Sequence, residues 1–399
     1  MKIGIVVDNE LNNDKRVLRE AQILKDNGHK IFALCFRFDR KDYKDINGIG
    51  ITRVNISRRL KNTLFLLFNT LPLYERLWSS RISRFIIDND LDFIHAHDLY
   101  MAKCAFTGIR KSGKSVKLIL DLHENFAFQI TTYNWTKGFL RKIISRPELW
   151  ENKEKDYLEY ADRIIVLSDD FRDHLVSKYP SLKKENFCAL PNVPDVEQMN
   201  SFKADLSKIP FKKRCPILCY FGIVAERRGI FIALSGFSDL IKEGADLDFL
   251  IIGPVDKKDR PLFNKIIGSD ELRNRIIYVP WIDLSDLPSY LEISDICIAP
   301  FVKNPQHESG VANKIYDYML GAKPIIASNC IPQQRLIERH KCGLIFENHK
   351  ELHDAIIRLV EDKELRVRMG KNGYAAVVKE YNTEIVKENL IRMYNSLIL

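Results

Sequence analysis

The stretch HESGVANKIYDYMLGAKPIIAS, residues 307–328, decides the fold. It follows an apolar run, ISDICIAPF, that is typical of a buried strand, and it ends in KPIIAS, which predicts the next buried strand. Between them, Ile315, Tyr318 and Met319 fall at i, i+3 and i+4 and predict a helix that Gly321 ends. This succession of strand, loop, helix and strand predicts a parallel sheet.

The loop before this helix predicts an anion-binding site. Small and polar residues over 304–313 would leave backbone N–H groups free at a helix N-terminus, at the carboxyl edge of the sheet, where ligands bind. Asp317 lies one turn into the helix. Its carboxylate could accept hydrogen bonds from sugar hydroxyls or could simply complement the helix dipole.

Composition limits the classes of partner. The 399 residues suggest two domains, and a hydrophobic content of 46% is enough for packed cores. The net charge of +9 allows nucleic acid, an anionic membrane surface or phosphorylated small molecules as partners. Nucleic acid ranks last, because the sequence shows no recognisable nucleic-acid-binding module.

Cysteine usage and hydropathy predict a cytoplasmic location. The eight cysteines show no CxxC or CxxH spacing, which indicates a reducing compartment and argues against zinc or a disulfide framework. MKIGIVVDN is interpreted as a first strand rather than a signal peptide, because it has no long apolar core. No run reaches the roughly 18–20 apolar residues that a membrane span needs.

The first half of the chain predicts a doubly wound sheet. KIGIVV is a strand, Asp14 is the expected N-cap of a helix that Gly28 ends, and HKIFALCF starts the next strand. The first turn has no G-x-G-x-x-G motif, and no G-x-x-x-x-G-K-[ST] loop occurs in the chain. The unit is therefore neither a dinucleotide fingerprint nor a P-loop.

Two consecutive strands of this half end in histidine and carboxylate side chains. Those of LDFIHAHDLY are His95, His97 and Asp98, and those of VKLILDLHENF are Asp121, His123 and Glu124. Because parallel strands end at the same sheet edge, we expect these groups to lie together where ligands bind. A single histidine is usually structural, whereas two such endings favour a function.

Two stretches combine basic and apolar residues. Residues 58–86 alternate basic residues with Leu, Phe and Trp, and residues 133–160 are amphipathic and basic at their start. Residues 58–86 fit either a core-packed helix pair or an interfacial helix on an anionic leaflet, and residues 133–146 add to the expectation of a role at a membrane surface.

The strand–helix alternation begins again at Cys215 without a sequence repeat. We therefore predict an α/β chain of two Rossmann-like, doubly wound domains that face a cleft. The first would cover residues 1–196, a polar linker 197–213 and the second 214–379. Within the second domain, Ser285 is the expected N-cap of a helix.

Two cations of the second half suit phosphate. Arg228, beside Gly229, could grip a phosphate with its guanidinium fork, or it could be a solvated surface residue. Lys314 is open to the same two interpretations. Together with the loop amides, both would stabilise a departing diphosphate without a metal.

Over essentially its whole length the chain resembles a GT-B glycosyltransferase of the family 4 type. The ordered set of signatures is specific, although each is weak alone. Five segments resemble the family's acceptor-side domain: DKRVLREAQILKDNGHKI, IHAHDLY, DLHE, ADRIIVLS and LPNV. Four later segments resemble its donor-side domain: YFGIVAERRG, FLIIGP, SDICIAPF and NKIYDYMLGAKPIIAS.

The resemblance implies a nucleotide-sugar donor in the C-terminal domain and an acceptor in the N-terminal domain. It also implies retention of anomeric configuration with no metal or other cofactor, and a last helix, about residues 380–399, that crosses back to the N-terminal domain.

By resemblance, Arg228 binds the diphosphate, Asp317 binds the ribose and His123 lies beside the reacting centre. The implied catalytic residues are His123, Arg228 and Lys314; the donor-binding residues are Gly222, Arg227, Gly253, Glu308, Ser309, Gly310, Val311, Ala312, Asn313 and Asp317; the acceptor-side residues are His97, Asp98 and Glu124.

Three positions depart from the family pattern or leave it open. Ile223 stands where many members carry a second phosphate-binding arginine, so that contact is either missing or supplied elsewhere, by Arg227 or Lys314. The glutamate that grips the donor sugar falls at Ser309 by strict spacing, and Glu308 would need a slipped loop. Gly253 would let the nucleotide approach, or would serve packing alone.

These observations predict sugar transfer from a nucleoside-diphosphate sugar to a hydroxyl of a glycan or lipid-linked acceptor, in surface polysaccharide synthesis. A peripheral position on the inner face of a membrane is a further expectation. The rival functions are a nucleotide-sugar epimerase with the same two-domain plan and a two-domain protein that binds a sugar or phosphate without chemistry.

Overall fold

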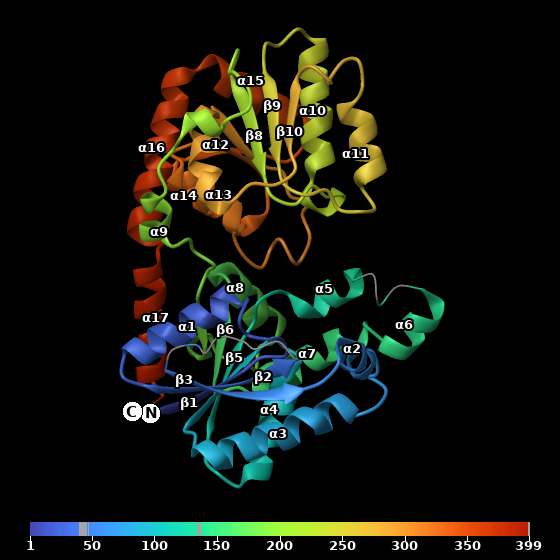
Figure 1. Ribbon diagram of the computed structural model, residues 1–399, viewed down its shortest axis with the longest axis vertical. Coiled ribbons are helices and arrows are strands. Elements are labelled where there is room, and N and C mark those ends of the chain that lie inside the picture. The colour runs from blue at the N-terminus through green and yellow to red at the C-terminus, as the bar shows by residue number, and fades with distance from the viewer. Residues whose placement is uncertain (40–45, 47, 134–135, 137, 398–399) are drawn as a thin grey trace. The chain divides into compact units, whose positions relative to one another are not determined.

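The chain folds into two compact units. The structure is a computed structural model that describes residues 1–39, 46, 48–133, 136 and 138–397 (Figure 1). The first unit comprises Met1–Pro191 and Lys387–Leu399, and the second comprises Asn192–Val386. Each unit is built on one parallel sheet with helices in the connections between strands (Figure 1). The predicted pair of Rossmann-like α/β folds is confirmed.

The sheet of the first unit has the strand order β3-β2-β1-β4-β5-β6-β7. Its strands are β1 (Lys2–Val6), β2 (Lys30–Arg37), β3 (Ile49–Asn55), β4 (Phe93–His97), β5 (Lys117–Asp121), β6 (Arg163–Val166) and β7 (Phe187–Ala189). Its helices are α1 (Lys15–Asp26), α2 (Arg58–Leu66), α3 (Leu73–Asn89), α4 (Met101–Ser112), α5 (Phe126–Thr132), α6 (Phe139–Ser145), α7 (Leu149–Glu159) and α8 (Asp169–Lys178). Strand β1 pairs with both β2 and β4, so the strand order reverses there.

The sheet of the second unit has the order β10-β9-β8-β11-β12-β13. Its strands are β8 (Ile217–Phe221), β9 (Asp248–Ile252), β10 (Ile276–Val279), β11 (Ile296–Ala299), β12 (Ile325–Ser328) and β13 (Gly343–Phe346). Its helices are α9 (Val196–Ser201), α10 (Ile230–Lys242), α11 (Arg260–Ile267), α12 (Leu287–Ile293), α13 (Asn313–Leu320), α14 (Ile331–His340), α15 (His349–Glu361) and α16 (Lys363–Glu380). Here the order reverses between β8 and β11.

Local signals in the sequence set most helix starts. Asp14 caps α1 as predicted, because its Oδ1 accepts a hydrogen bond from the Val17 N–H at 3.2 Å. The predicted N-cap at Ser285 is wrong. A 3-10 turn covers Leu284–Asp286, and α12 begins after Asp286 with Pro288 in its first turn. Proline suits that position, because the N–H that it lacks would have no partner there.

Residues 58–86 fold into a pair of helices with different surroundings. Helix α3 is packed into the core through Tyr74, Trp78 and Ile82. Helix α2 has no buried residue. The core-packing interpretation therefore holds for α3, while α2 packs only the partly buried Leu64 and Phe65 against the same core.

The stretch predicted as a linker is packed against the second unit. It contains α9 and a 3-10 turn, Leu206–Lys208. The Asp205 N–H donates to Ser289 Oγ at 2.9 Å, and Lys208 pairs with Asp286, so the turn is held on α12. The last helix, α17 (Thr383–Asn395), enters the first unit from Lys387 onwards. Residues 398 and 399 of the predicted crossing segment lie outside the described residues.

Across the part of the chain that the structure describes, no helix combines the length and the apolar character that a membrane crossing requires.

Candidate active site

Each sheet has its functional side chains where the strand order reverses. In the first unit, β1 is followed by Asp8, and β4 ends at His97 and is followed by Asp98. In the second unit, Gly222 follows β8, and Phe301 closely follows β11. In doubly wound sheets, this carboxyl edge at the reversal of strand order is the place where ligands bind.

In the second unit, the loop before α13 exposes a run of backbone donors. Helix α13 has Ala312 as its N-cap residue and receives no side-chain cap. Among the described residues, the N–H groups of residues 310–314 donate no hydrogen bond within the chain. Five successive amides and the positive end of the helix dipole form a site suited to an anion.

Two basic side chains beside this loop, Arg228 and Lys314, each have a buried nitrogen with no hydrogen-bond acceptor among the described residues. The Lys314 side chain is buried, and its Nζ, which has no hydrogen-bond partner in the described part of the chain, lies 3.5 Å from the centroid of the Tyr220 ring. Burial and the nearby Arg228 hold the Lys314 pKa well below its ordinary value. The buried Nε of Arg228 also has no described partner, and its guanidinium lies over the Phe301 ring at 5.5 Å. Charges without partners suit an anionic ligand.

Three glycines shape the backbone around these cations. Gly229 has φ +75°, and a Cβ there would lie 1.5 Å from Pro300 O. Gly253 has φ +134°, and its Cβ would lie 2.2 Å from Gly222 O. A Cβ at Gly222 would lie 3.1 Å from Lys314 Nζ. Gly253 therefore has a packing reason to be glycine, and a nucleotide contact there stays a prediction.

The other predicted donor residues have varied surroundings. Glu308 Oε1 accepts a hydrogen bond from the Ile331 N–H at 3.1 Å, and the buried Ser309 hydroxyl donates to Gln306 O at 2.7 Å. Burial raises the Asp317 pKa to about 7, against the opposing effect of Lys314. Arg227 is exposed and pairs with Asp256 at 3.5 Å.

In the first unit, histidines and carboxylates gather around Asp121. His97 and Asp121 lie opposite each other on the paired strands β4 and β5. His123 Nε2 lies 3.0 Å from Asp121 Oδ2, and His97 Nδ1 lies 3.2 Å from the same oxygen. Asp98, with φ +74°, has its Oδ1 3.9 Å from His123 Nδ1. The predicted meeting of the two strand endings is therefore observed.

The same groups open onto a cavity of about 620 Å³ within the first unit. His123, Asp98 and Glu124 line it together with the aromatic rings of Phe65 and Phe126. Burial raises the pKa of the carboxyl groups of both Asp98 and Glu124. Carboxyl groups and aromatic faces are suited to the hydroxyls and apolar faces of a sugar.

Sequence reasoning missed the basic partner of Asp121. Arg16 donates from Nε to Oδ2 at 2.9 Å and from Nη2 to Oδ1 at 2.8 Å, and its Nη1 donates to Leu190 O at 3.0 Å. Arg16 and Glu20 occur at i and i+4 beside the apolar face of α1, and both are buried. The i, i+4 spacing of Arg16 and Glu20 was the only sign of this ion pair in the sequence, and a solvent-exposed pair would have the same spacing.

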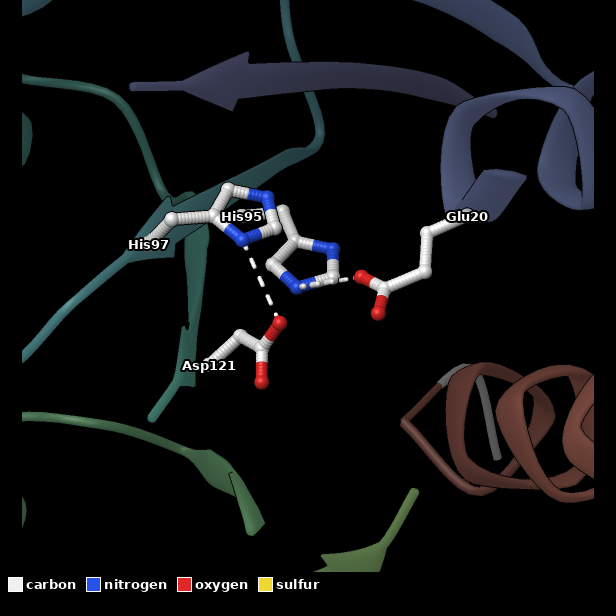
Figure 2. Close-up of side chains that lie close together, drawn as sticks. All are labelled: Glu20, His95, His97 and Asp121. Carbon is white, nitrogen blue, oxygen red and sulfur yellow. Dashed lines mark ion pairs between the residues drawn. The ribbon is translucent and has the colours of Figure 1, made fainter. Parts of the chain in front are cut away.

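Four buried side chains of this region point toward one another: Glu20, His95, His97 and Asp121 (Figure 2). In the described chain, their ligand atoms lie within 4.8 Å of one another, as a metal site would require. However, Arg16 already holds both oxygens of Asp121 and lies 3.2 Å from Glu20 Oε1. A divalent ion would compete with this guanidinium, so the charges favour an ion-pair network.

The predicted site residues therefore form one group in each unit. The second unit brings together Gly222, Gly253, Arg228, Lys314 and the 310–314 loop. The first brings together His97, Asp98 and His123.

Family models match both units. Residues 201–376 match the model described as "Glycosyl transferases group 1", and residues 15–198 match that of "Glycosyltransferase Family 4". Among curated relatives, the alpha-D-kanosaminyltransferase of Streptomyces kanamyceticus is 24% identical over 61% of this chain and 63% of its own length. The capsular polysaccharide biosynthesis glycosyltransferase CapM of Staphylococcus aureus is 22% identical over 61% of this chain and 64% of its own length. The chain thus spans less than two thirds of either relative.

Solved structures share the fold over the whole chain. The sucrose-phosphate synthase of Thermosynechococcus elongatus superposes with a TM-score of 0.74 at 17% identity, covering 100% of this chain and 99% of that one. HepE of Anabaena, in complex with UDP and glucose, superposes with a TM-score of 0.72 at 14% identity, covering 99% and 100%.

Proposed function

This chain belongs to the group 1 glycosyltransferases, with the GT-B fold, and we propose that it transfers a sugar from a nucleoside-diphosphate sugar to a hydroxyl of a glycan or lipid-linked acceptor. One observation carries the proposal: in the described chain, the N–H groups of residues 310–314 have no internal acceptor, and they lie in the second unit with two cations, Arg228 and Lys314, whose buried nitrogens also lack one. A diphosphate offers the oxygen acceptors and the negative charge that these donors lack.

The donor is held by the second unit. Arg228 and Lys314 bind the diphosphate, the backbone at Gly222 leaves room beside Lys314, and the Asp317 carboxylate accepts hydrogen bonds from the ribose hydroxyls. UDP bound to HepE supports uridine diphosphate sugars as the first donors to test. The sugar contact falls to Glu308 or Ser309.

The reaction breaks the bond between the anomeric carbon and the diphosphate oxygen and forms a bond to the acceptor oxygen. Negative charge grows on the leaving diphosphate, where the cations and amides stabilise it without a metal or other cofactor. The acceptor's proton passes to the leaving phosphate, and the product retains the anomeric configuration. His123 lies beside the reacting centre, with His97, Asp98 and Glu124 on the acceptor side.

The cellular setting is surface polysaccharide synthesis on the cytoplasmic face of a membrane. CapM, a relative named for capsular polysaccharide biosynthesis, supports this setting. In the first unit, α2 and α6 are in contact and expose Leu60 (51%), Phe139 (81%) and Ile143 (54%). Basic residues flank these apolar side chains, as on helices that bind anionic lipid surfaces. Residues 134, 135 and 137, in the second predicted interfacial stretch, lie outside the described residues.

A binding screen followed by a turnover assay tests the proposal. Purified protein is titrated with nucleoside diphosphates and their sugars, and Arg228→Ala is expected to weaken binding at least about tenfold, the loss of a charged hydrogen bond. The matched control is Arg273→Ala, an exposed arginine of the same unit that pairs with Asp270. Equal binding by Arg228→Ala and the wild type would remove the diphosphate role.

Turnover then separates the rival functions. Transfer to acceptors from a membrane extract, with retained configuration by NMR and full activity after chelation of metals, is the expected result. Conversion of the donor without any acceptor would indicate an epimerase. Tight donor binding without turnover of any donor or acceptor would indicate a binding protein.

A further inference from the structure

The Asp121 carboxylate is the centre of a buried hydrogen-bond network that ends at His123. Arg16 on α1 donates to it from Nε and Nη2, and two ring nitrogens lie beside its Oδ2, His123 Nε2 at 3.0 Å and His97 Nδ1 at 3.2 Å. These two ring nitrogens are also 3.0 Å from each other, so one of them can donate to the other. Asp121 and His97 are buried, at 0% and 2% exposure. Three of these nitrogens lie at Oδ2, and one, Arg16 Nη2, lies at Oδ1.

The two ring nitrogens of His123 face different surroundings. Nε2 points at Asp121 Oδ2, while the Nδ1 atom lies 3.9 Å from Asp98 Oδ1, and both His123 and Asp98 line the cavity of about 620 Å³. The His123 side chain is 22% exposed, so one edge of the ring is accessible. Nε2 also lies 3.0 Å from His97 Nδ1. Because the carboxylate oxygen can only accept, a proton on Nε2 makes the hydrogen bond to Asp121, whereas a bare Nε2 would set its lone pair against that oxygen even if it accepted from His97.

We propose that Arg16 and Asp121 are positioning residues that keep a proton on His123 Nε2 and thereby make Nδ1 the nitrogen that His123 presents to the substrate. Arg16 keeps Asp121 ionised, Asp121 fixes the ring, and Nδ1 donates a hydrogen bond to an oxygen of the bound sugar. The last of these steps rests on the proposed glycosyl transfer; the first two concern the protein alone.

The charges around the ring make it a donor rather than a base. Burial opposes the charge, but Asp121 and Asp98 outweigh it and raise the His123 pKa to about 9. Although burial also opposes ionisation of Asp121, Arg16 and His123 hold its pKa well below the ordinary value. The titratable and charged groups that interact with the ring from the surrounding elements are Arg16, Glu20, His95, His97, Asp98, Asp121 and Glu124.

Nitrogen NMR of the whole protein tests the positioning without any substrate. Histidines are labelled with 15N, and long-range proton–nitrogen spectra report which ring nitrogens carry protons between pH 5 and pH 10. We expect His123 to keep its Nε2 proton throughout and to lose the Nδ1 proton near pH 9. In Asp121→Asn, the His123 pKa should fall by roughly 2, the usual effect of removing an adjacent charge. His353, which pairs with Glu243, is the internal reference and should not move.

The transfer rate supplies the second readout. In the wild type it should fall above about pH 9, and in Asp121→Asn the fall should begin at a pH lower by the same amount as the NMR shift. A bare Nε2 in the wild type, or an unchanged His123 titration in a folded Asp121→Asn, overturns the proposal.

A second variant decides the matter if Asp121→Asn does not fold. Arg16→Lys keeps the positive charge but loses the paired hydrogen bonds of the guanidinium to Asp121, so the pKa values of Asp121 and His123 should change measurably. Unchanged pKa values in that variant would overturn the proposal. If no donor or acceptor is ever turned over, the proposed function fails, while the NMR titration still decides the positioning.

Discussion

Lys314 Nζ lies 3.5 Å from the centroid of the Tyr220 ring and, within the described chain, has no hydrogen-bond acceptor. An ammonium group over an aromatic face keeps part of its electrostatic stabilisation, but it is not satisfied as it would be in water. Burial and Arg228 lower the Lys314 pKa, so its charged form is less stable than that of an exposed lysine, and a bound anion would offset this cost.

Donor binding should therefore be coupled to proton uptake. The bound diphosphate raises the Lys314 pKa, so a proton is gained between the lowered value of the free protein and the raised value of the complex, and affinity falls as pH rises through that window. Calorimetric titration with UDP in two buffers of different ionisation enthalpy measures the number of protons. Lys314→Met should abolish the uptake; equal heats in both buffers for the wild type would contradict the prediction.

Gly229→Ala should destabilise the second unit. The new Cβ would meet Pro300 O at 1.5 Å, and the residue would also be held at φ +75°. We expect a loss of about 3 kcal/mol or more, from overpacking and backbone strain together. Gly244→Ala is the control, because it has φ +89° but nothing within 4 Å of its Cβ, and it should cost only about 1–2 kcal/mol. Denaturant unfolding compares the two, and equal losses would show that the contact with Pro300 is unimportant.

Tyr394→Phe should weaken the attachment of α17 to the first unit. The buried Tyr394 hydroxyl is hydrogen-bonded to His95 Nδ1 at 3.0 Å, and neither side chain is exposed. Removing the hydroxyl leaves a buried ring nitrogen without a partner, at a cost of about 1–3 kcal/mol. Tyr374→Phe, at a half-exposed tyrosine, should be neutral. Hydrogen exchange of the α17 amides measures the effect, and unchanged exchange rates in Tyr394→Phe would refute it.

Membrane association should depend on α2 and α6. Replacing Phe139 and Ile143 by glutamate removes exposed apolar area and adds negative charge, so sedimentation with anionic vesicles at low salt should drop severalfold. Ile232→Glu changes an exposed apolar residue of the second unit and should have no effect. If the wild-type protein fails to sediment with these vesicles, the proposed peripheral location is wrong.

Local rules worked where the determining contact is close in sequence. Asp14 could be assigned as a cap because its partner, the Val17 N–H, is three residues away. The N-cap prediction at Ser285 is wrong because Pro288 is a competing local signal for the helix start, and α12 begins after Asp286. The strand endings at His97 and Asp121 could be placed together because neighbouring parallel strands share an edge.

The sequence by itself determined the fold class, the place of the polar loop before α13, and the positions of the cations and histidines near the strand ends, because each depends on a short period or a short spacing. Only the tertiary structure decided how these groups are paired. Arg16 reaches Asp121 across 105 positions and Tyr394 reaches His95 across 299. Nothing in a local pattern distinguishes a buried, bidentate arginine from a solvated one. The burial of Asp121 and its hydrogen-bond partners are set only when segments distant in sequence pack around its carboxylate. Those contacts decide which nitrogen of His123 carries its proton.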